Sequence, residues 1–263
     1  TTDQVSTLST LQLAVLTSAQ LLKMETDDIA AITTDQITAL KTAQMAALTT
    51  AQVVALSEDQ VATLTTAQLA ALTTAQLAKM ETDDIAAITT AQITALTTAQ
   101  IAALTTAQAV AISEDQVAVL KTAQLAALTT VNFVEMSTDQ LAAITTAQIS
   151  ALTTAQVSAL TEDQAVSLSE DQVAALKTAQ VAALSTANLA AMSEDQVAAL
   201  TTAQVTALTT AQIVALTEDQ VAAMGTAQLA ALTTAQLAKM ETDDIAAITT
   251  DQITALKTAQ MAA

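Results

Sequence analysis

The chain has 263 residues, of which 52% are apolar, and a formal net charge of −19 from 26 acidic residues against seven lysines. It contains no Trp, Tyr, Cys, His, Pro or Arg, and Phe133 and Gly225 are the only residues of their kinds. Without Cys and His a disulfide framework, a zinc site and thiol chemistry are excluded. The charge also argues against a nucleic-acid-binding surface, which needs cations to neutralise phosphates.

An eight-residue repeat organises the chain from its first residue. Starting at Thr1, the sequence divides without insertion or deletion into 32 octads and a seven-residue remnant: TTDQVSTL, STLQLAVL, TSAQLLKM, ETDDIAAI and so on to KTAQMAA. The consensus is T-T-A-Q-φ-A-A-L, where φ is Leu, Val or Ile. Because every octad is equivalent, we expect residues 1–263 to form a single repeat array. The chain opens and closes in mid-pattern, which suggests a window of a longer array.

Each octad carries the signals that start a helix. Position 1 is usually Thr or Ser and position 4 is nearly always Gln, which is the pattern of a capping box. The Leu at position 8 and the φ residue of the next octad form a hydrophobic staple, and positions 5 to 8 are mostly good helix formers. Where position 1 is Lys41, Glu25 or Gly225, for example, we expect the Thr at position 2 to replace the lost cap.

The charged residues support helices that start anew in every octad. All acidic residues except Glu135 fall at positions 1 to 4, and all seven lysines fall at position 7 or position 1. Anions at helix N-termini and cations at C-termini complement the helix dipole. Octads with acidic first turns show no fixed interval, so we expect a surface that is acidic on all sides.

These patterns predict an all-α fold, a solenoid of very short capped helices with one helix per octad. A long kinked helix is the main alternative, although its apolar stripe would rotate around the axis and never face one partner. A β-solenoid would need alternating apolar residues and turn residues. Since isolated helices of this length are unstable, positions 5 and 8 of successive turns must meet in one core. Three octads per turn is the tightest closed arrangement.

Few residues suggest chemistry. The octad ETDDIAAI at 25–32, 81–88 and 241–248 could bind a hard cation such as Ca²⁺ through its carboxylates, but we favour acidic residues at a helix N-terminus, balanced by a lysine just upstream. The irregular octad TTVNFVEM at 129–136 indicates a local packing variant rather than a binding pocket. No His can activate a Ser or Thr, and one Gly cannot build a phosphate-binding loop.

We therefore assign no catalytic, cofactor-binding or metal-binding residues, and expect neither an enzyme nor a cofactor. No stretch of 18 residues is free of Thr, Gln or charge, so membrane insertion is not expected.

Tandem L-T-T-A-Q-V/I-A-A-L octads resemble the repeat tracts of very large bacterial secreted or cell-surface proteins of the adhesin or haemagglutinin type. This resemblance covers the whole chain and implies an elongated, secreted, surface-attached protein. We expect a structural extracellular protein that forms a stalk, fibre or matrix filament, with itself and cell-surface or matrix components as partners and no nucleic acid. The alternative is an adhesin or Ca²⁺-responsive spacer that uses the acidic octads. A designed solenoid is a third possibility, against which irregular octads such as STANLAAM speak.

Overall fold

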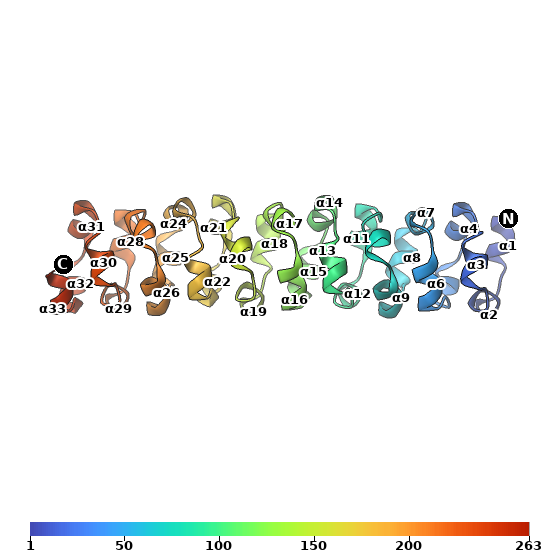
Figure 1. Ribbon diagram of the computed structural model, residues 1–263, viewed down its shortest axis with the longest axis horizontal. Helices are drawn as coiled ribbons and strands as arrows, with labels where there is room; N and C mark the ends of the chain where they lie inside the picture. Colours follow the sequence, from blue (N-terminus) through green and yellow to red (C-terminus); the bar gives the residue numbers. More distant parts are fainter. Residues whose placement is uncertain (263) are drawn as a thin grey trace. The chain divides into compact units, whose positions relative to one another are not determined.

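The computed structural model describes residues 1–262, and in this range it contains 33 α-helices of four to six residues and no strand. Every helix begins at position 2 of an octad, and position 1 is its N-cap (Figure 1). The predicted all-α fold with one short capped helix per octad is therefore confirmed.

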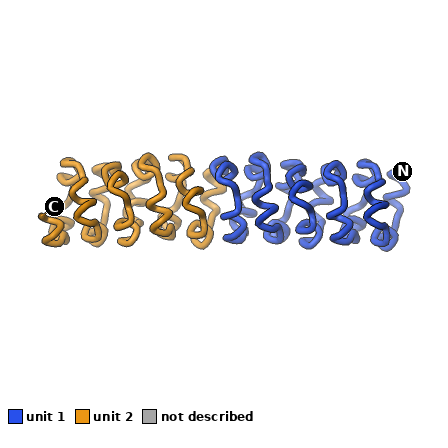
Figure 2. Tube along the Cα trace, in the orientation of Figure 1, with its two compact units in different colours: residues 1–136 blue, residues 137–263 orange. Residues whose placement is uncertain are grey.

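The chain falls into two compact units, Thr1–Met136 and Ser137–Ala263 (Figure 2). The first unit contains α1 (Thr2–Ser6), α2 (Thr10–Ala14), α3 (Ser18–Leu21), α4 (Thr26–Ala30), α5 (Thr34–Ile37), α6 (Thr42–Ala47), α7 (Thr50–Val54), α8 (Glu58–Thr63), α9 (Thr66–Ala71), α10 (Thr74–Leu77), α11 (Thr82–Ala87), α12 (Thr90–Ile93), α13 (Thr98–Ala102), α14 (Thr106–Val110), α15 (Glu114–Val119), α16 (Thr122–Ala127) and α17 (Thr130–Val134). The second contains α18 (Thr138–Ala142), α19 (Thr146–Ile149), α20 (Thr154–Ser158), α21 (Glu162–Ser167), α22 (Glu170–Ala175), α23 (Thr178–Val181), α24 (Thr186–Ala191), α25 (Glu194–Ala198), α26 (Thr202–Ala207), α27 (Thr210–Val214), α28 (Glu218–Ala223), α29 (Thr226–Leu229), α30 (Thr234–Leu237), α31 (Thr242–Ala247), α32 (Thr250–Ala255) and α33 (Thr258–Met261).

The capping box fixes where each helix starts. In α7, the Thr49 hydroxyl accepts from the backbone N–H of Gln52 at 3.1 Å, and the Gln52 Oε1 accepts from the backbone N–H of Thr49 at 2.9 Å. Thr49 itself is extended, with φ −71° and ψ 159°. No residue of the described range has a positive φ. The chain therefore turns between helices through ordinary extended backbone, which explains why it needs almost no glycine.

The N-cap does not move where position 1 lacks a hydroxyl. Lys41 and Gly225 remain the N-caps of α6 and α29, so the expectation that the Thr at position 2 replaces the lost cap was wrong. The reason is that the position-4 amide still holds the first backbone N–H: the N–H of Gly225 donates to Gln228 Oε1 at 2.6 Å. One half of the box is enough to keep the helix in register.

Within each unit, helices pack against the third helix along the chain, as α6 does against α9 and α25 against α28. The position-4 glutamine reaches one octad further back. Gln52 Nε2 donates to the carbonyls of Leu21 at 2.8 Å and Met24 at 2.9 Å, which lie 31 and 28 residues earlier. Each turn therefore takes between three and four octads, slightly more than the tightest arrangement of three.

We call the glutamines that make these bonds the glutamine ladder. They are 2 to 5% exposed, and their amides join consecutive turns beside the core formed by positions 5 and 8. In the first unit the ladder consists of Gln36, Gln44, Gln52, Gln60, Gln68, Gln76, Gln92, Gln100, Gln108, Gln116 and Gln124. In the second it consists of Gln172, Gln180, Gln196, Gln204, Gln212, Gln220, Gln228, Gln236, Gln252 and Gln260.

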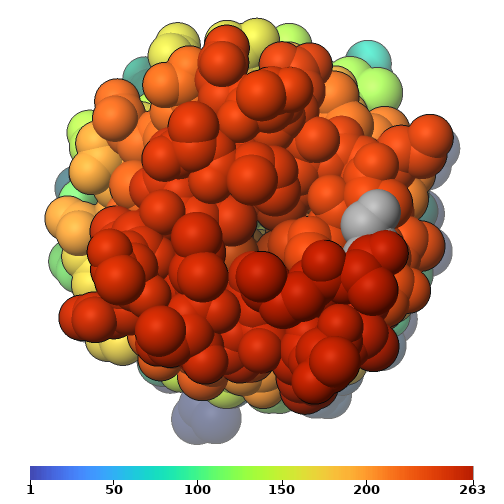
Figure 3. Space-filling view, turned by 90° about the vertical axis from the view of Figure 1, so that its left-hand side faces the viewer, coloured from blue at the N-terminus to red at the C-terminus, as the bar shows by residue number. Residues whose placement is uncertain are grey.

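Burial of the apolar residues depends on stacking of the next turn. The octads 81–88 and 241–248 have identical sequences, yet Ile85 is 1% exposed and Ile245 is 41% exposed. Ile245 lies in the last turns of the second unit (Figure 3), where it borders a hollow with Met240, Ile248 and Ile253. Covering such a side chain is worth on the order of 1 kcal/mol. The core is thus made between octads and not within them.

Removing a ladder amide should destabilise the solenoid far more than removing an exposed threonine. Gln212→Ala leaves the carbonyls of Val181 and Leu184 without their amide donor, and we expect a loss of about 1–3 kcal/mol in the free energy of unfolding. Gln212→Glu keeps the acceptor for the Thr209 N–H but removes the donor, so its loss should be at least as large. Urea unfolding measures both.

Thr210→Ala, an exposed position at the start of the same helix, is the matched control and should cost nothing measurable. Equal midpoints for Gln212→Glu and the wild type would show that the amide donor does not hold the turns together.

Candidate functional site: an acidic ribbon

Helices with acidic first turns pack against one another within each unit. In the first unit α5 contacts α8, which contacts α11, and in the second α22, α25, α28 and α31 form a continuous series. The ladder joins acidic octads that lie four apart: Gln116 of α15 donates to the Ile85 carbonyl of α11 at 3.1 Å. The acidic octads recur every three or four octads, which is the interval of one solenoid turn. The expectation of an acidic surface on all sides was therefore wrong.

We call this series of stacked carboxylates the acidic ribbon of each unit. In the first unit it consists of Asp3, Glu25, Asp27, Asp28, Asp35, Glu58, Asp59, Glu81, Asp83, Asp84, Glu114 and Asp115. In the second it consists of Asp139, Glu162, Asp163, Glu170, Asp171, Glu194, Asp195, Glu218, Asp219, Glu241, Asp243, Asp244 and Asp251.

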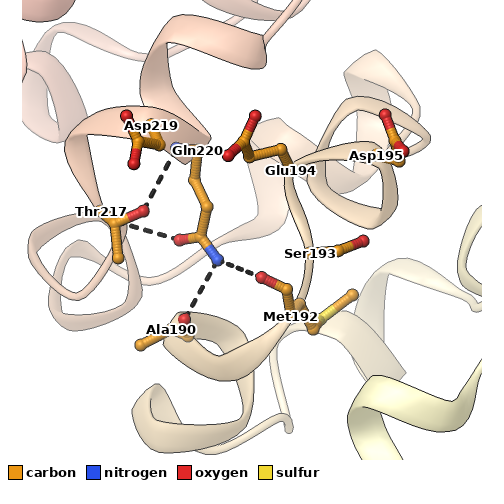
Figure 4. A pocket seen from close by; sticks show the side chains of 8 residues that line it. All are labelled: Ala190, Met192, Ser193, Glu194, Asp195, Thr217, Asp219 and Gln220. Atoms are coloured by element: carbon orange, nitrogen blue, oxygen red, sulfur yellow. Dashed lines mark hydrogen bonds between the residues drawn. The ribbon is translucent and has the colours of Figure 1, made fainter.

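A hollow of about 410 Å³ shows how the ribbon is built (Figure 4). Glu194 and Asp195 at the start of α25 and Asp219 at the start of α28 line it, so carboxylates of consecutive turns share one open surface. Gln220 lies beneath them, and its Nε2 donates to the carbonyls of Met192 at 2.6 Å and Ala190 at 3.2 Å. The ladder therefore sets the distance between successive carboxylate pairs.

The octad ETDDIAAI places its carboxylates in the same ribbon. In the second unit Glu241, Asp243 and Asp244 line a hollow together with Glu218 and Asp219 of the preceding turn. The candidate cation-binding residues are thus brought together with others from a second octad. No three acidic side chains of residues 1–262 converge closely enough to form a metal-binding group.

Asp84 is the carboxylate that the fold perturbs most clearly. It is 4% exposed, and its Oδ2 accepts from the backbone N–H of Glu81 at 3.1 Å. Burial raises the pKa of Asp84 to about 6, against the lowering effect of that hydrogen bond, and the negative charges of Glu81, Glu58 and Asp83 raise it further. The ribbon therefore contains a carboxyl group that titrates close to neutral pH.

Lysines stay apart from the ribbon. Four of them are N-caps, and the helices they cap pack within each unit against helices without acidic first turns, as α6 does against α3 and α9 and α23 against α20 and α26. Over residues 1–262 no lysine ammonium lies within 4.0 Å of a carboxylate. The negative charge of the ribbon is therefore not neutralised by ion pairs. The N-cap lysines are Lys41, Lys121, Lys177 and Lys257.

The irregular octad 129–136 is a packing variant. Phe133 occupies the φ position and is fully buried, whereas Val131 is 64% exposed. Asn132 replaces the ladder glutamine, and its shorter side chain donates only to the Leu104 carbonyl, at 2.7 Å. This octad keeps the solenoid's contacts with a larger core residue.

The sequence analysis found the capping role of position 4 but missed its role as a bridge between turns. The available signal was chemical: Glu serves a capping box as well as Gln does, yet no octad has Glu at position 4. Only an amide also supplies a donor.

The helices found in residues 1–262 are all too short, and too polar, to cross a lipid bilayer.

The ribbon should make stability depend on salt. Raising the ionic strength from about 0.01 M to about 0.5 M shortens the screening length from about 30 Å to a few Å, so repulsion between stacked carboxylates should fall and the thermal midpoint should rise. The double variant Glu194→Gln with Asp219→Asn should show a smaller rise. Glu135→Gln removes an acidic residue outside the ribbon and should behave like the wild type. An equal salt dependence in the double variant and the wild type would contradict a ribbon under strain.

Comparison with known families gives a match to the model of the ALTTAQ repeat, at residues 21–58, 77–114, 133–170, 170–202 and 198–226. Comparison with curated proteins gave no match. The matched segments cover well over half of the chain, and their name spells the helix start and ladder glutamine described above. The chain belongs to the ALTTAQ repeat family.

Proposed function

We propose that this chain is a structural extracellular repeat protein, an elongated α-solenoid that acts as a stalk, fibre or matrix filament. The observation that carries the proposal is the repetition of one turn-to-turn contact. Buried residues at positions 5 and 8 and a ladder glutamine join successive turns throughout each unit. Turns can therefore be added without any new kind of contact, so length itself is the property that the sequence encodes.

The charge and composition suit an exposed setting. A net charge of −19 keeps such solenoids apart in solution and disfavours nucleic acid as a partner. The resemblance to repeat tracts of bacterial surface proteins supports an extracellular or cell-surface location. The proposal assigns the protein no catalytic activity, because no His or Cys is present to act as a base or thiolate.

We propose the chain itself as one partner and cell-surface or matrix components as others. Ile245, Ile253 and Met261 are 41%, 41% and 62% exposed in the last turns of the second unit, where they offer an apolar surface to another solenoid turn. A contact of this kind does not close on itself and leads to fibres.

Electron microscopy of the purified chain over a range of concentrations tests the proposal. We expect uniform fibres that lengthen with concentration. Ile245→Glu combined with Ile253→Glu should shorten them, because the change puts charge on the apolar surface. Val166→Glu, at a side position that is 47% exposed, is the matched control and should leave fibre length unchanged. Compact particles at every concentration would contradict a filament or stalk.

A second candidate function is a Ca²⁺-responsive spacer or adhesin. It is favoured by the two hollows in which carboxylates of consecutive turns lie together, one of them lined by Glu194, Asp195 and Asp219. Oxygen ligands are those that Ca²⁺ prefers. The structural proposal does not need this ion.

Calorimetric titration with Ca²⁺ separates the two functions. For a purely structural protein we expect no heat of binding and no rise in thermal midpoint at about millimolar Ca²⁺, the range of weak extracellular sites. Heat and stabilisation that disappear in Glu194→Gln with Asp219→Asn would instead establish the spacer. Glu135→Gln, outside the ribbon, is the control.

A further inference from the structure

The glutamine ladder is interrupted at Asp84. The neighbouring octads place Gln76 Nε2 against the carbonyls of Met45 and Leu48, and Gln92 Nε2 against those of Val61 and Leu64. By the same register, 31 and 28 residues back, Val53 and Leu56 are the carbonyls that correspond to Asp84. An ionised carboxylate has no proton to donate to them.

The chain itself shows that a side chain of this length can make one of the two bonds. Asn132 and Asn188 also stand at position 4, and they have the same number of side-chain heavy atoms as Asp84. Their Nδ2 atoms donate to the carbonyls 28 residues earlier, those of Leu104 at 2.7 Å and Leu160 at 2.8 Å. A protonated aspartic acid has the same shape as asparagine and one donor in the same place.

The surroundings of Asp84 penalise its ionised form. The side chain is 4% exposed, and the helices that pack against α11 are α8 and α14. Helix α14 carries no charged residue. The charged residues of α8 and of the segment around α11 are Glu58, Asp59, Lys79, Glu81 and Asp83, and all of these except Lys79 are negative.

We propose that Asp84 is a pH-operated bridge between two turns of the first unit: when protonated it donates to the Leu56 carbonyl, as Asn132 does to Leu104, and when ionised it leaves that step of the ladder open. This inference is independent of the proposed function. It concerns only how the acidity of the surroundings sets the strength of one turn-to-turn contact.

The direction of the pH effect follows from the pKa. The folded chain holds the pKa of Asp84 at about 6, above its ordinary value of 3.8, so protonation favours the folded state. The stabilisation is fully present below the ordinary value and is lost as the pH rises through 6. Acidification from neutral pH should therefore strengthen this part of the solenoid, whereas acid usually weakens proteins that depend on ionised carboxylates.

Thermal unfolding of the whole chain between about pH 4.5 and about pH 7.5 tests the bridge in Asp84→Asn and Asp84→Gln. At the upper pH roughly one folded molecule in thirty carries the proton, so both variants should melt above the wild type. At the lower pH the wild type is protonated, and the difference from Asp84→Asn should fall close to zero. Asp84→Gln restores both donors and should melt highest at the upper pH.

Asp83→Asn is the matched control, because it removes an exposed carboxylate one residue away and leaves the ladder unchanged. Its difference from the wild type should be small and should not follow a titration near pH 6. A difference between Asp84→Asn and the wild type that is the same at every pH would overturn the proposal. So would an equal response in Asp83→Asn.

Discussion

A single side chain, the glutamine at position 4, makes both of the contacts on which this architecture depends. Its Oε1 holds the first backbone N–H of its own helix, and its Nε2 donates to carbonyls of the preceding turn, as Gln52 does to Leu21 and Met24. The first contact starts a helix of only four to six residues, and the second holds that helix on a neighbour. Neither contact alone would be enough, because a helix this short is unstable by itself and its apolar residues are covered only by another turn. The two identical octads around Ile85 and Ile245 show the dependence directly.

Local chemistry explains why much of the fold could be predicted from the sequence. Helix starts are written into each octad by Thr or Ser at position 1 and Gln at position 4, and every one of them lies where the pattern places it. The number of octads per turn could not be predicted, because it is set by packing between residues about 28 positions apart. The same gap hid the acidic ribbon: the intervals between acidic octads look irregular until they are compared with the length of a turn. The effect of burial on Asp84 was hidden for the same reason, since its cause is the turn beneath it.

The distribution of charge separates the sides of each unit. Carboxylates at the starts of α22, α25, α28 and α31 follow one another from turn to turn, whereas Lys177 caps a helix that packs among neutral ones. Each carboxylate is favourable to its own helix, whose N-terminus carries a partial positive charge, and unfavourable to the carboxylates of the next turn. The ribbon is thus a compromise between local and long-range electrostatics, and its balance responds to salt and to protons. Whether the proposed filament or the Ca²⁺-responsive spacer is its use, the ribbon is the surface that a cationic partner would meet first.

The number of octads in one turn also restricts how such an array can change length during evolution. Losing one octad would turn every later octad to a different side of its unit and would break the ribbon into pieces that face different directions. Losing or gaining seven octads, which is 56 residues and twice the 28-residue step of the ladder, would leave every side chain on its original side. The sequence carries this spacing: the octad ETDDIAAI recurs at 25 and 81, and acidic octads beginning SEDQV recur at 57 and 113, in each case 56 residues apart. Seven octads, and not one, form the unit in which an array of this kind can be copied without disturbing its surface.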